Sequence, residues 1–363
     1  LREDASRLLS SRKLAARHQK RDASLQLIET SFSHISDIYC DGQQAWMIGA
    51  SPTLNAELAV FEVEDQTLHK VLQNNAPTLP SSFISKPTPI SFNTTENAVA
   101  HGFYYRPTNP DYIGNEGTRP PLIVICHGGP TGSTSTAMNL KIQYWTSRGF
   151  SVLDVNYRGS TGYGRAYREQ LHRQWGVADV ADVVAGAQYL IDQQLVDPNK
   201  IAIRGSSAGG YTVLAALCFH EVFKAGACLY GIGDLETLAR DTHKFESRYL
   251  DKLIGPYPEE KSVYIDRSPI HHIDQLHCPV IFFQGLDDKV VPPEQAIAMT
   301  AALKEKNLPV AYLPFSGEGH GFRKAETIKT SLEAELYFYG QIFDFQPHGK
   351  LPEVHIDNLH RDK

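Results

Sequence analysis

Cysteine is scarce in this sequence, with five residues in a chain of 363 and no Cys-x-x-Cys pair. The number is odd, and most of these cysteines stand inside apolar runs. Both features favour buried free thiols in a reducing compartment over a disulfide framework or a zinc site. We therefore expect a cytoplasmic protein. The five cysteines are Cys40, Cys126, Cys218, Cys228 and Cys278.

Long apolar runs and an excess of positive charge are also missing. No stretch approaches the ~18 consecutive apolar residues that a membrane-spanning helix requires. The formal net charge is -6, so we expect no nucleic-acid partner and no membrane partner. Apolar residues make up 42% and charged residues 21%, which is typical of a folded globular chain. No metal, nucleotide or haem motif is present, so the sequence implies no cofactor and no metal.

The chain divides into segments of different character. Residues 1–24 are rich in Arg and Lys and have no apolar centre, which excludes a secretory signal. They predict either a basic amphipathic helix or a solvated segment exposed by cutting a longer protein. Residues 25–89 contain short strand-like runs and then a linker rich in Pro, Ser and Thr. Asp41-Gly42 is a hairpin signal inside them, so residues 25–73 predict a small antiparallel sheet.

Residues 90–363 follow a different pattern. Near-continuous apolar runs such as LIVICH (122–127) and GFSVLDVNY (149–157) predict strands buried on both faces. These runs alternate with helical stretches, for example over 179–194 and 325–346. The alternation predicts an α/β fold with a doubly wound, mostly parallel sheet covered by helices on both sides.

The decisive segment is IAIRGSSAGG (201–210), which fits G-x-S-x-G with Ser207 at its centre. In an α/β-hydrolase this pattern forms a sharp strand-to-helix turn that exposes a nucleophilic serine. The flanking glycines are needed because strand and helix pass too closely there for a side chain. Ser206 is the alternative nucleophile, but it stands one place early in the pattern.

A serine hydroxyl needs a base, and the base needs a carboxylate that orients it. In α/β-hydrolases the order along the chain is Ser, Asp, His. His320 lies in the glycine-rich segment GEGHGF after a late strand, which makes it the expected base. Asp287 and Asp288 compete for the third role. We favour Asp287 because it comes first after its strand, and we expect Asp288 to face solvent or to cap the turn.

The tetrahedral intermediate of acyl transfer also needs hydrogen-bond donors for its oxyanion. The backbone N–H of Ala208, which follows the nucleophile, is one expected donor. The second is expected from the loop His127-Gly128-Gly129-Pro130. We assign it to Gly129, with Gly128 as the alternative.

Five motifs together resemble the catalytic domain of the prolyl oligopeptidase family of serine peptidases. They are HGGP (127–130), NYRGSTGYG (156–164), GSSAGGY (205–211), QGLDDKVVP (284–292) and GEGHGF (317–322). The resemblance covers residues 90–346 and is closest to the acylaminoacyl-peptidase and dipeptidyl-aminopeptidase-like branch. It implies a substrate pocket near Val290, Tyr230 and Tyr157.

The resemblance also implies a covering domain. Family members carry an N-terminal β-propeller, and residues 25–73 resemble its last blade. Since one blade cannot bury its own faces, the sequence suggests a C-terminal fragment, or a second chain that supplies the cover. An exposed edge of the blade favours pairing between chains, so a homo-oligomer is also expected.

The function implied is hydrolysis of short peptides through a seryl acyl-enzyme. Two alternatives remain: a carboxylesterase or lipase on the same fold, and a catalytically silent binding module. Retention of Ser207, Asp287 and His320 in their expected contexts argues against the silent module.

Overall fold

The computed structural model describes residues 28–72, 79–241 and 248–359. The basic segment 1–24 lies outside the described residues, as does the linker stretch 73–78. Two compact units are present. One contains the N-terminal region up to Thr88 with Tyr105–Ile113 and Ser135–Arg148, and the other contains Pro89–Tyr104, Gly114–Thr134 and the chain from Gly149 onward.

The N-terminal unit contains a four-stranded antiparallel sheet, as the sequence predicts. Its order follows the chain: β1 (His34–Cys40), β2 (Gln44–Ser51), β3 (Leu54–Glu62) and β4 (Thr67–Leu72). The predicted turn at Asp41-Gly42 joins β1 to β2. The Asp41 carboxylate accepts the Gln43 and Gln44 N–H groups at 2.9 and 2.8 Å, and Gly42 adopts a φ of 100° that suits glycine.

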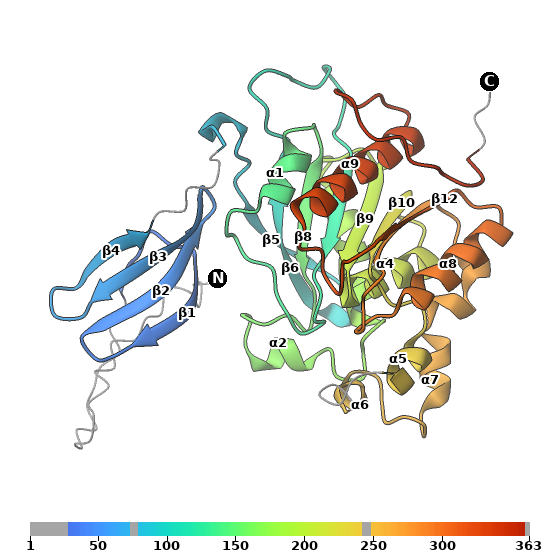
Figure 1. The fold of residues 1–363 in the computed structure, drawn as a ribbon, viewed down its shortest axis with the longest axis horizontal. Helices are drawn as coiled ribbons and strands as arrows, with labels where there is room; N and C mark the ends of the chain where they lie inside the picture. Colours follow the sequence, from blue (N-terminus) through green and yellow to red (C-terminus); the bar gives the residue numbers. More distant parts are fainter. Residues whose placement is uncertain (1–27, 73–78, 242–247, 360–363) are drawn as a thin grey trace. The chain divides into compact units, whose positions relative to one another are not determined.

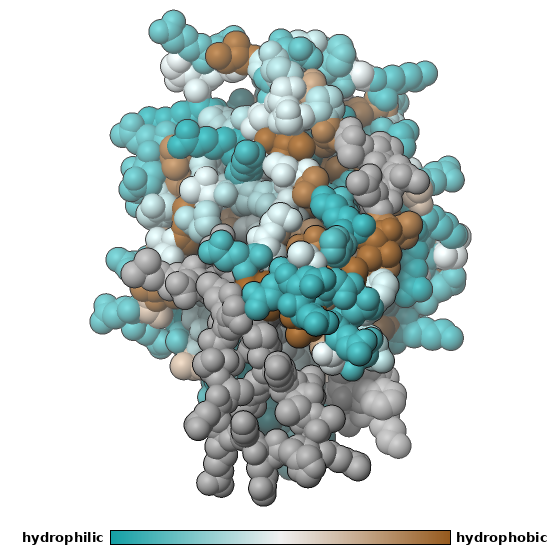
Figure 2. Space-filling view, turned by 90° about the vertical axis from the view of Figure 1, so that its left-hand side faces the viewer, coloured by the Kyte–Doolittle hydropathy of each residue, from teal (hydrophilic) through white to brown (hydrophobic). Residues whose placement is uncertain are grey.

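This sheet buries a small core and leaves other apolar side chains at the surface. The buried members are Phe32, Ala45, Met47, Ala59 and Phe61. Brown hydrophobic side chains interrupt the hydrophilic surface in Figure 2. Exposed apolar residues on the four strands are Ile38, Tyr39, Ile48, Val71 and Leu72.

The larger unit is built on a mostly parallel eight-stranded sheet, which confirms the predicted α/β class. The strands lie in the order β12-β11-β10-β9-β7-β8-β6-β5, and every neighbouring pair from β12 to β8 is parallel. Their bounds are β5 (Thr88–Asn93), β6 (Val99–Tyr105), β7 (Leu122–Cys126), β8 (Ser151–Asn156), β9 (Ile201–Ser206), β10 (Ala225–Leu229), β11 (Val280–Gly285) and β12 (Val310–Phe315).

Helices cover both faces of this sheet (Figure 1). The described helices are α1 (Leu140–Thr146), α2 (Arg165–Glu169), α3 (Ala178–Asp192), α4 (Ala208–Phe219), α5 (Leu235–Asp241), α6 (Tyr249–Leu253), α7 (Lys261–Asp266), α8 (Pro293–Glu305) and α9 (Ala325–Ile342). Helix α4 packs on β9 and β10, and α9 is tied to β9 by the buried Arg204–Glu335 ion pair at 2.9 Å. All five cysteines are free, with Cys40 exposed and the other four buried. No helix in the described part of the chain is long and apolar enough to cross a membrane.

The topology explains where a site can form. Strands β9, β11 and β12 are parallel, so their carboxyl ends meet at one edge of the sheet. The segments that follow these three strands begin at Ser207, Leu286 and Ser316. In α/β folds ligands bind beyond the carboxyl ends of the strands, which is where these segments converge.

Candidate active site

Ser207 stands alone between the end of β9 and the start of α4. Its backbone has φ 55° and ψ -123°, a strained conformation for a residue with a side chain. The flanking glycines make the turn possible. A Cβ on Gly205 would lie 2.3 Å from the Gly209 carbonyl oxygen, and one on Gly209 would lie 2.2 Å from the Cys126 carbonyl oxygen. Both distances are far below van der Waals contact, so only glycine fits on either side of Ser207.

The structure brings His320 to Ser207 across 113 residues of chain. His320 Nε2 lies 2.8 Å from Ser207 Oγ, and its Nδ1 lies 2.8 Å from Asp288 Oδ2. In this arrangement Nδ1–H donates to the carboxylate and Nε2 is left to accept the serine proton. The three side chains come from the turns after β9, β11 and β12.

The expectation that Asp287 orients the histidine is wrong in this structure. Asp287 is exposed, and its backbone N–H donates to the Glu318 carbonyl oxygen at 2.9 Å. The Asp288 side chain is fully buried. Its Oδ1 accepts the N–H groups of Val290 and Val291, both at 2.9 Å, which leaves Oδ2 for His320. The turn that begins at Asp288 therefore fixes the carboxylate that the histidine meets.

The glycine-rich loop after β7 lies against the nucleophile. A Cβ on Gly128 would be 3.3 Å from the Ser206 carbonyl oxygen and 3.7 Å from Ser207 Cβ. Gly129 has φ 125° and is exposed, so its backbone is accessible to a ligand. Ala208 begins helix α4 directly after Ser207. The N–H groups of Gly129 and Ala208 remain the predicted oxyanion donors.

Of the three predicted pocket residues, Tyr157 is placed wrongly by the sequence. Its side chain is fully buried, stacks on the His127 ring at 4.1 Å and donates its hydroxyl to the His127 carbonyl oxygen at 3.0 Å. Tyr157 therefore cannot touch a substrate. Tyr230 packs edge-on against the His320 ring at a centroid distance of 5.0 Å. Val290 is partly buried beside the core, and its place in a substrate pocket remains a prediction.

Glu318 is a buried acidic residue that fastens the histidine segment. Its two carboxylate oxygens accept the N–H groups of Arg323 and Lys324, each at 3.0 Å. Burial alone would raise the pKa of Glu318, but these bonds and one with the Thr327 side chain outweigh it, and the pKa lies below the usual 4.5. The carboxylate thus ties both sides of His320 to the start of α9.

Replacing Glu318 by glutamine is expected to lower both the thermal unfolding midpoint and peptide turnover at pH 7, since an amide has only one acceptor oxygen for these donors. The folded state lowers the pKa of Glu318, so its stabilisation is present above pH 4.5 and is lost as the pH falls through the folded-state value. The midpoints of variant and wild type should therefore converge at low pH. Glu326→Gln, an exposed change in the first turn of α9, is the control. Equal midpoints for wild type and Glu318→Gln at pH 7 would contradict this role.

Comparison with known proteins identifies the family of this chain. Residues 136–346 match the Prolyl oligopeptidase family, Peptidase_S9. The chain belongs to the prolyl oligopeptidase family. This membership makes it a serine-type peptidase domain, and it fits an α/β-hydrolase sheet with Ser207 on its elbow.

Several relatives of this prolyl oligopeptidase family member have solved structures. A puromycin-hydrolyzing peptidase from Mycobacterium tuberculosis is 45% identical with a TM-score of 0.89, covering 92% of this chain and 51% of that chain. A puromycin hydrolase structure is 37% identical with a TM-score of 0.88 and the same two coverages, 92% and 51%. Dipeptidyl aminopeptidase BIII from Pseudoxanthomonas mexicana is 29% identical over 250 residues, 66% of this chain and 36% of that protein. The chain thus spans about half the length of these solved structures and about a third of the curated relative.

Sequence reasoning gave the histidine contact to the wrong aspartate, although its expectation that Asp288 could cap the turn is confirmed, and it did not single out Glu318 or Ser160. Asp288 is found by its context, because an Asp whose carboxylate caps the two following amides in D-x-V-V is a recognisable turn signal. Glu318 has a weaker signal, as an acidic residue shortly before a helix start. Ser160 carries no local signal, since its partner His127 lies 33 residues away.

Proposed function

We propose that this chain is the catalytic domain of a peptidase that cleaves short peptides through Ser207, His320 and Asp288. The observation that supports it most is the pair of 2.8 Å contacts that His320 makes, one with Ser207 Oγ and one with Asp288 Oδ2. A serine on a strained elbow, a histidine within bonding reach and a buried carboxylate behind it are the parts that acyl transfer requires.

The steps follow from the positions of the protons. His320 Nε2 takes the Ser207 proton as the oxygen attacks the peptide carbonyl, and Asp288 stabilises the imidazolium that forms. The developing oxyanion is held by two N–H groups. One belongs to Gly129, on the loop after β7, and the other to Ala208, at the start of α4. His320 then donates the proton to the leaving amine. Water enters, and the same groups act in reverse to release the acid.

The N-terminal sheet is, in this proposal, one blade of a β-propeller that covers the site in the longer protein. Four short antiparallel strands in chain order and a core of few residues support it. Exposed apolar side chains such as Tyr39 and Leu72 also support it, because a single blade needs neighbours to cover them.

The experiment is a turnover assay of the chain with dipeptidyl and N-acylated p-nitroanilides, with puromycin, and with a p-nitrophenyl ester. Puromycin is included because the relatives above are named as its hydrolases. We expect hydrolysis of at least one class of aminoacyl or peptidyl amide, and covalent labelling by a fluorophosphonate. Turnover confined to the ester would favour a carboxylesterase, and a folded chain that neither labels nor turns over would contradict the proposal.

A further inference from the structure

His127 lies beneath the glycine loop and makes two polar contacts through its ring. Nδ1 is 2.8 Å from the Gly128 carbonyl oxygen, and Nε2 is 2.7 Å from Ser160 Oγ. Burial lowers the pKa of His127 to about 4, so the ring is neutral near pH 7 and carries a single N–H. Only one of the two nitrogens can therefore donate.

The partners decide which nitrogen carries the proton. The Gly128 carbonyl can only accept, so Nδ1 must be the donor, because two lone pairs facing each other at 2.8 Å would repel. Nε2 must then accept a proton from the Ser160 hydroxyl. That hydroxyl also lies 2.7 Å from the Tyr157 carbonyl oxygen, which already receives the Ser160 N–H at 3.0 Å. Ser160 Oγ donates to that carbonyl oxygen as well, so its single proton is shared between the Tyr157 carbonyl and Nε2 of the ring.

The bond from His127 fixes the direction of a peptide group at the site. A peptide unit is planar, and in its trans form the carbonyl of Gly128 and the N–H of Gly129 point in opposite directions. Holding the carbonyl toward the His127 ring therefore aims the Gly129 N–H away from it. Space for that carbonyl exists because residue 132 is glycine, whose Cβ would lie 2.8 Å from the Gly128 oxygen.

The segment Asn156–Thr161 holds the same loop at further points. The Asn156 amide accepts the Thr134 N–H at 2.8 Å and donates to the Thr134 carbonyl at 3.1 Å. The Thr161 N–H donates to the Gly132 carbonyl at 2.8 Å. Both ends and the middle of the loop from His127 to Thr134 are therefore bonded to one short segment.

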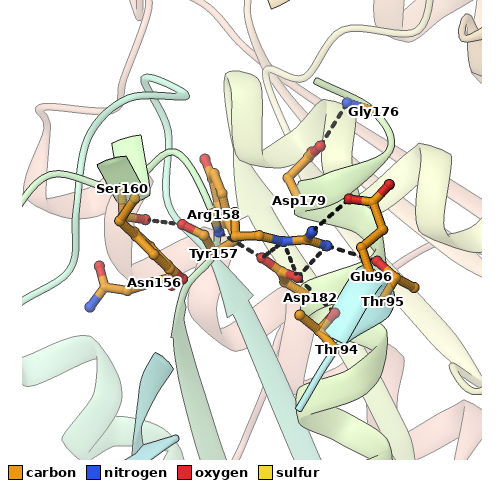
Figure 3. Close-up of polar contacts among 11 residues, drawn as sticks. Thr94, Thr95, Glu96, Asn156, Tyr157, Arg158, Ser160, Gly176, Asp179 and Asp182 are labelled. Atoms are coloured by element: carbon orange, nitrogen blue, oxygen red, sulfur yellow. Dashed lines mark hydrogen bonds and ion pairs between the residues drawn. The ribbon is translucent and has the colours of Figure 1, made fainter. Parts of the chain in front are cut away.

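A buried ion pair anchors that segment to helix α3 (Figure 3). The Arg158 guanidinium donates to Asp182 through Nε and Nη2, each at 2.9 Å, and the Arg158 N–H donates to the same carboxylate at 2.6 Å. Asp182 is fully buried, and Thr94 donates to it from the strand side at 2.8 Å. Breaking one partner of such a pair is costly, so Arg158 and Asp182 give the segment a rigid base.

We propose that Ser160 is a positioning residue for the oxyanion hole, acting through the tautomer of His127 on the direction of the Gly129 N–H. The inference rests on the proposed function for its catalytic consequence, and it assigns a role to the motif NYRGS that the triad does not use. Ser160 itself is fully buried and does not touch substrate.

The test compares Ser160→Ala with wild type in two measurements. With an amide that the turnover assay proposed above finds to be hydrolysed, kcat is expected to fall roughly 10- to 100-fold, because complete loss of an oxyanion donor costs about 10²–10³ and a misdirected donor costs less. KM should change less than about twofold. The inhibition constant of a peptide aldehyde, whose serine adduct has an oxyanion, should rise by the same factor as kcat falls. Ser262→Ala, an exposed change of the same kind on helix α7, should leave all three unchanged.

The second measurement is ¹⁵N NMR of the imidazoles, which needs no turnover. In wild type His127 should be protonated at Nδ1 and unprotonated at Nε2, and in Ser160→Ala this preference should weaken. Should Ser160→Ala fail to fold, Ser160→Cys, which keeps a side chain of similar size but replaces the hydroxyl by a weak donor, is assayed in the same way with the same expectations. A wild type protonated at Nε2, or a Ser160→Ala enzyme with unchanged kcat, would overturn the proposal. An inactive wild type with the expected tautomer would instead count against the proposed function alone.

Discussion

Replacing Ser207 by alanine is expected to lower kcat for a peptide anilide by a factor on the order of 10⁶, leaving KM within a few-fold of wild type. The reason is the geometry: Ser207 Oγ is the oxygen within 2.8 Å of His320 Nε2, so removing it removes the acyl-enzyme route. Residual turnover of about 10³–10⁴ over water should persist from the oxyanion donors and substrate binding. The measurement is a steady-state assay, with fluorophosphonate labelling as the parallel readout.

Ser206→Ala is the matched control for this result. Ser206 is the neighbouring serine of the same segment, and its side chain hydrogen bonds with Tyr230 instead of meeting His320. We expect it to retain most of the turnover and all of the labelling. Equal losses in the two variants would point to a collapsed elbow, and an active Ser207→Ala enzyme would exclude Ser207 as the nucleophile.

The second large effect separates two adjacent aspartates. Asp288→Asn is expected to lower kcat by about 10⁴, because the amide cannot hold the Nδ1–H tautomer of His320 or stabilise the imidazolium. Asp287→Asn should stay within about threefold of wild type, since that side chain is exposed. Both substitutions keep side-chain shape, so the comparison isolates charge and hydrogen-bonding direction.

Folding must be checked alongside, because Asp288 also caps the N–H groups of Val290 and Val291. An asparagine keeps one oxygen for those two donors, so the thermal midpoint of Asp288→Asn should fall only modestly. A large loss of activity in Asp287→Asn with full activity in Asp288→Asn would reverse the assignment made from the structure.

Much of the architecture can be predicted from the sequence, because the patterns that indicate strands, helices and turns are local. The apolar strands and alternating helices predict the parallel sheet, and Asp41-Gly42 predicts the hairpin in the first sheet. Gly205 and Gly209 predict the elbow, because a Cβ at either position would clash with nearby backbone. The two glycines lie within five residues of chain, so this requirement is visible in the sequence. His320 is predicted by its flanking glycines, and the structure does bring it to Ser207.

The choice between Asp287 and Asp288, in contrast, could not be made from a local sequence pattern. Both stand in the same turn after β11, and the sequence offers no periodicity that tells which carboxylate faces the histidine. The turn rotates one side chain inward and the other to solvent, and that rotation depends on which oxygen caps Val290 and Val291 and on the backbone bond from Asp287 to Glu318. Choosing the aspartate that comes first after the strand selects Asp287, which is the wrong one of the two.

By itself, then, the sequence determines the α/β class, the elbow at Ser207 and the choice of His320 as the proposed base, because each depends on residues that are neighbours in the chain. Only the tertiary structure decides which carboxylate meets His320, that Tyr157 is buried beneath the loop, and that Ser160 reaches His127. These are contacts between segments separated by tens of residues, and their geometry is set by the packing of strands and turns, which no local pattern records.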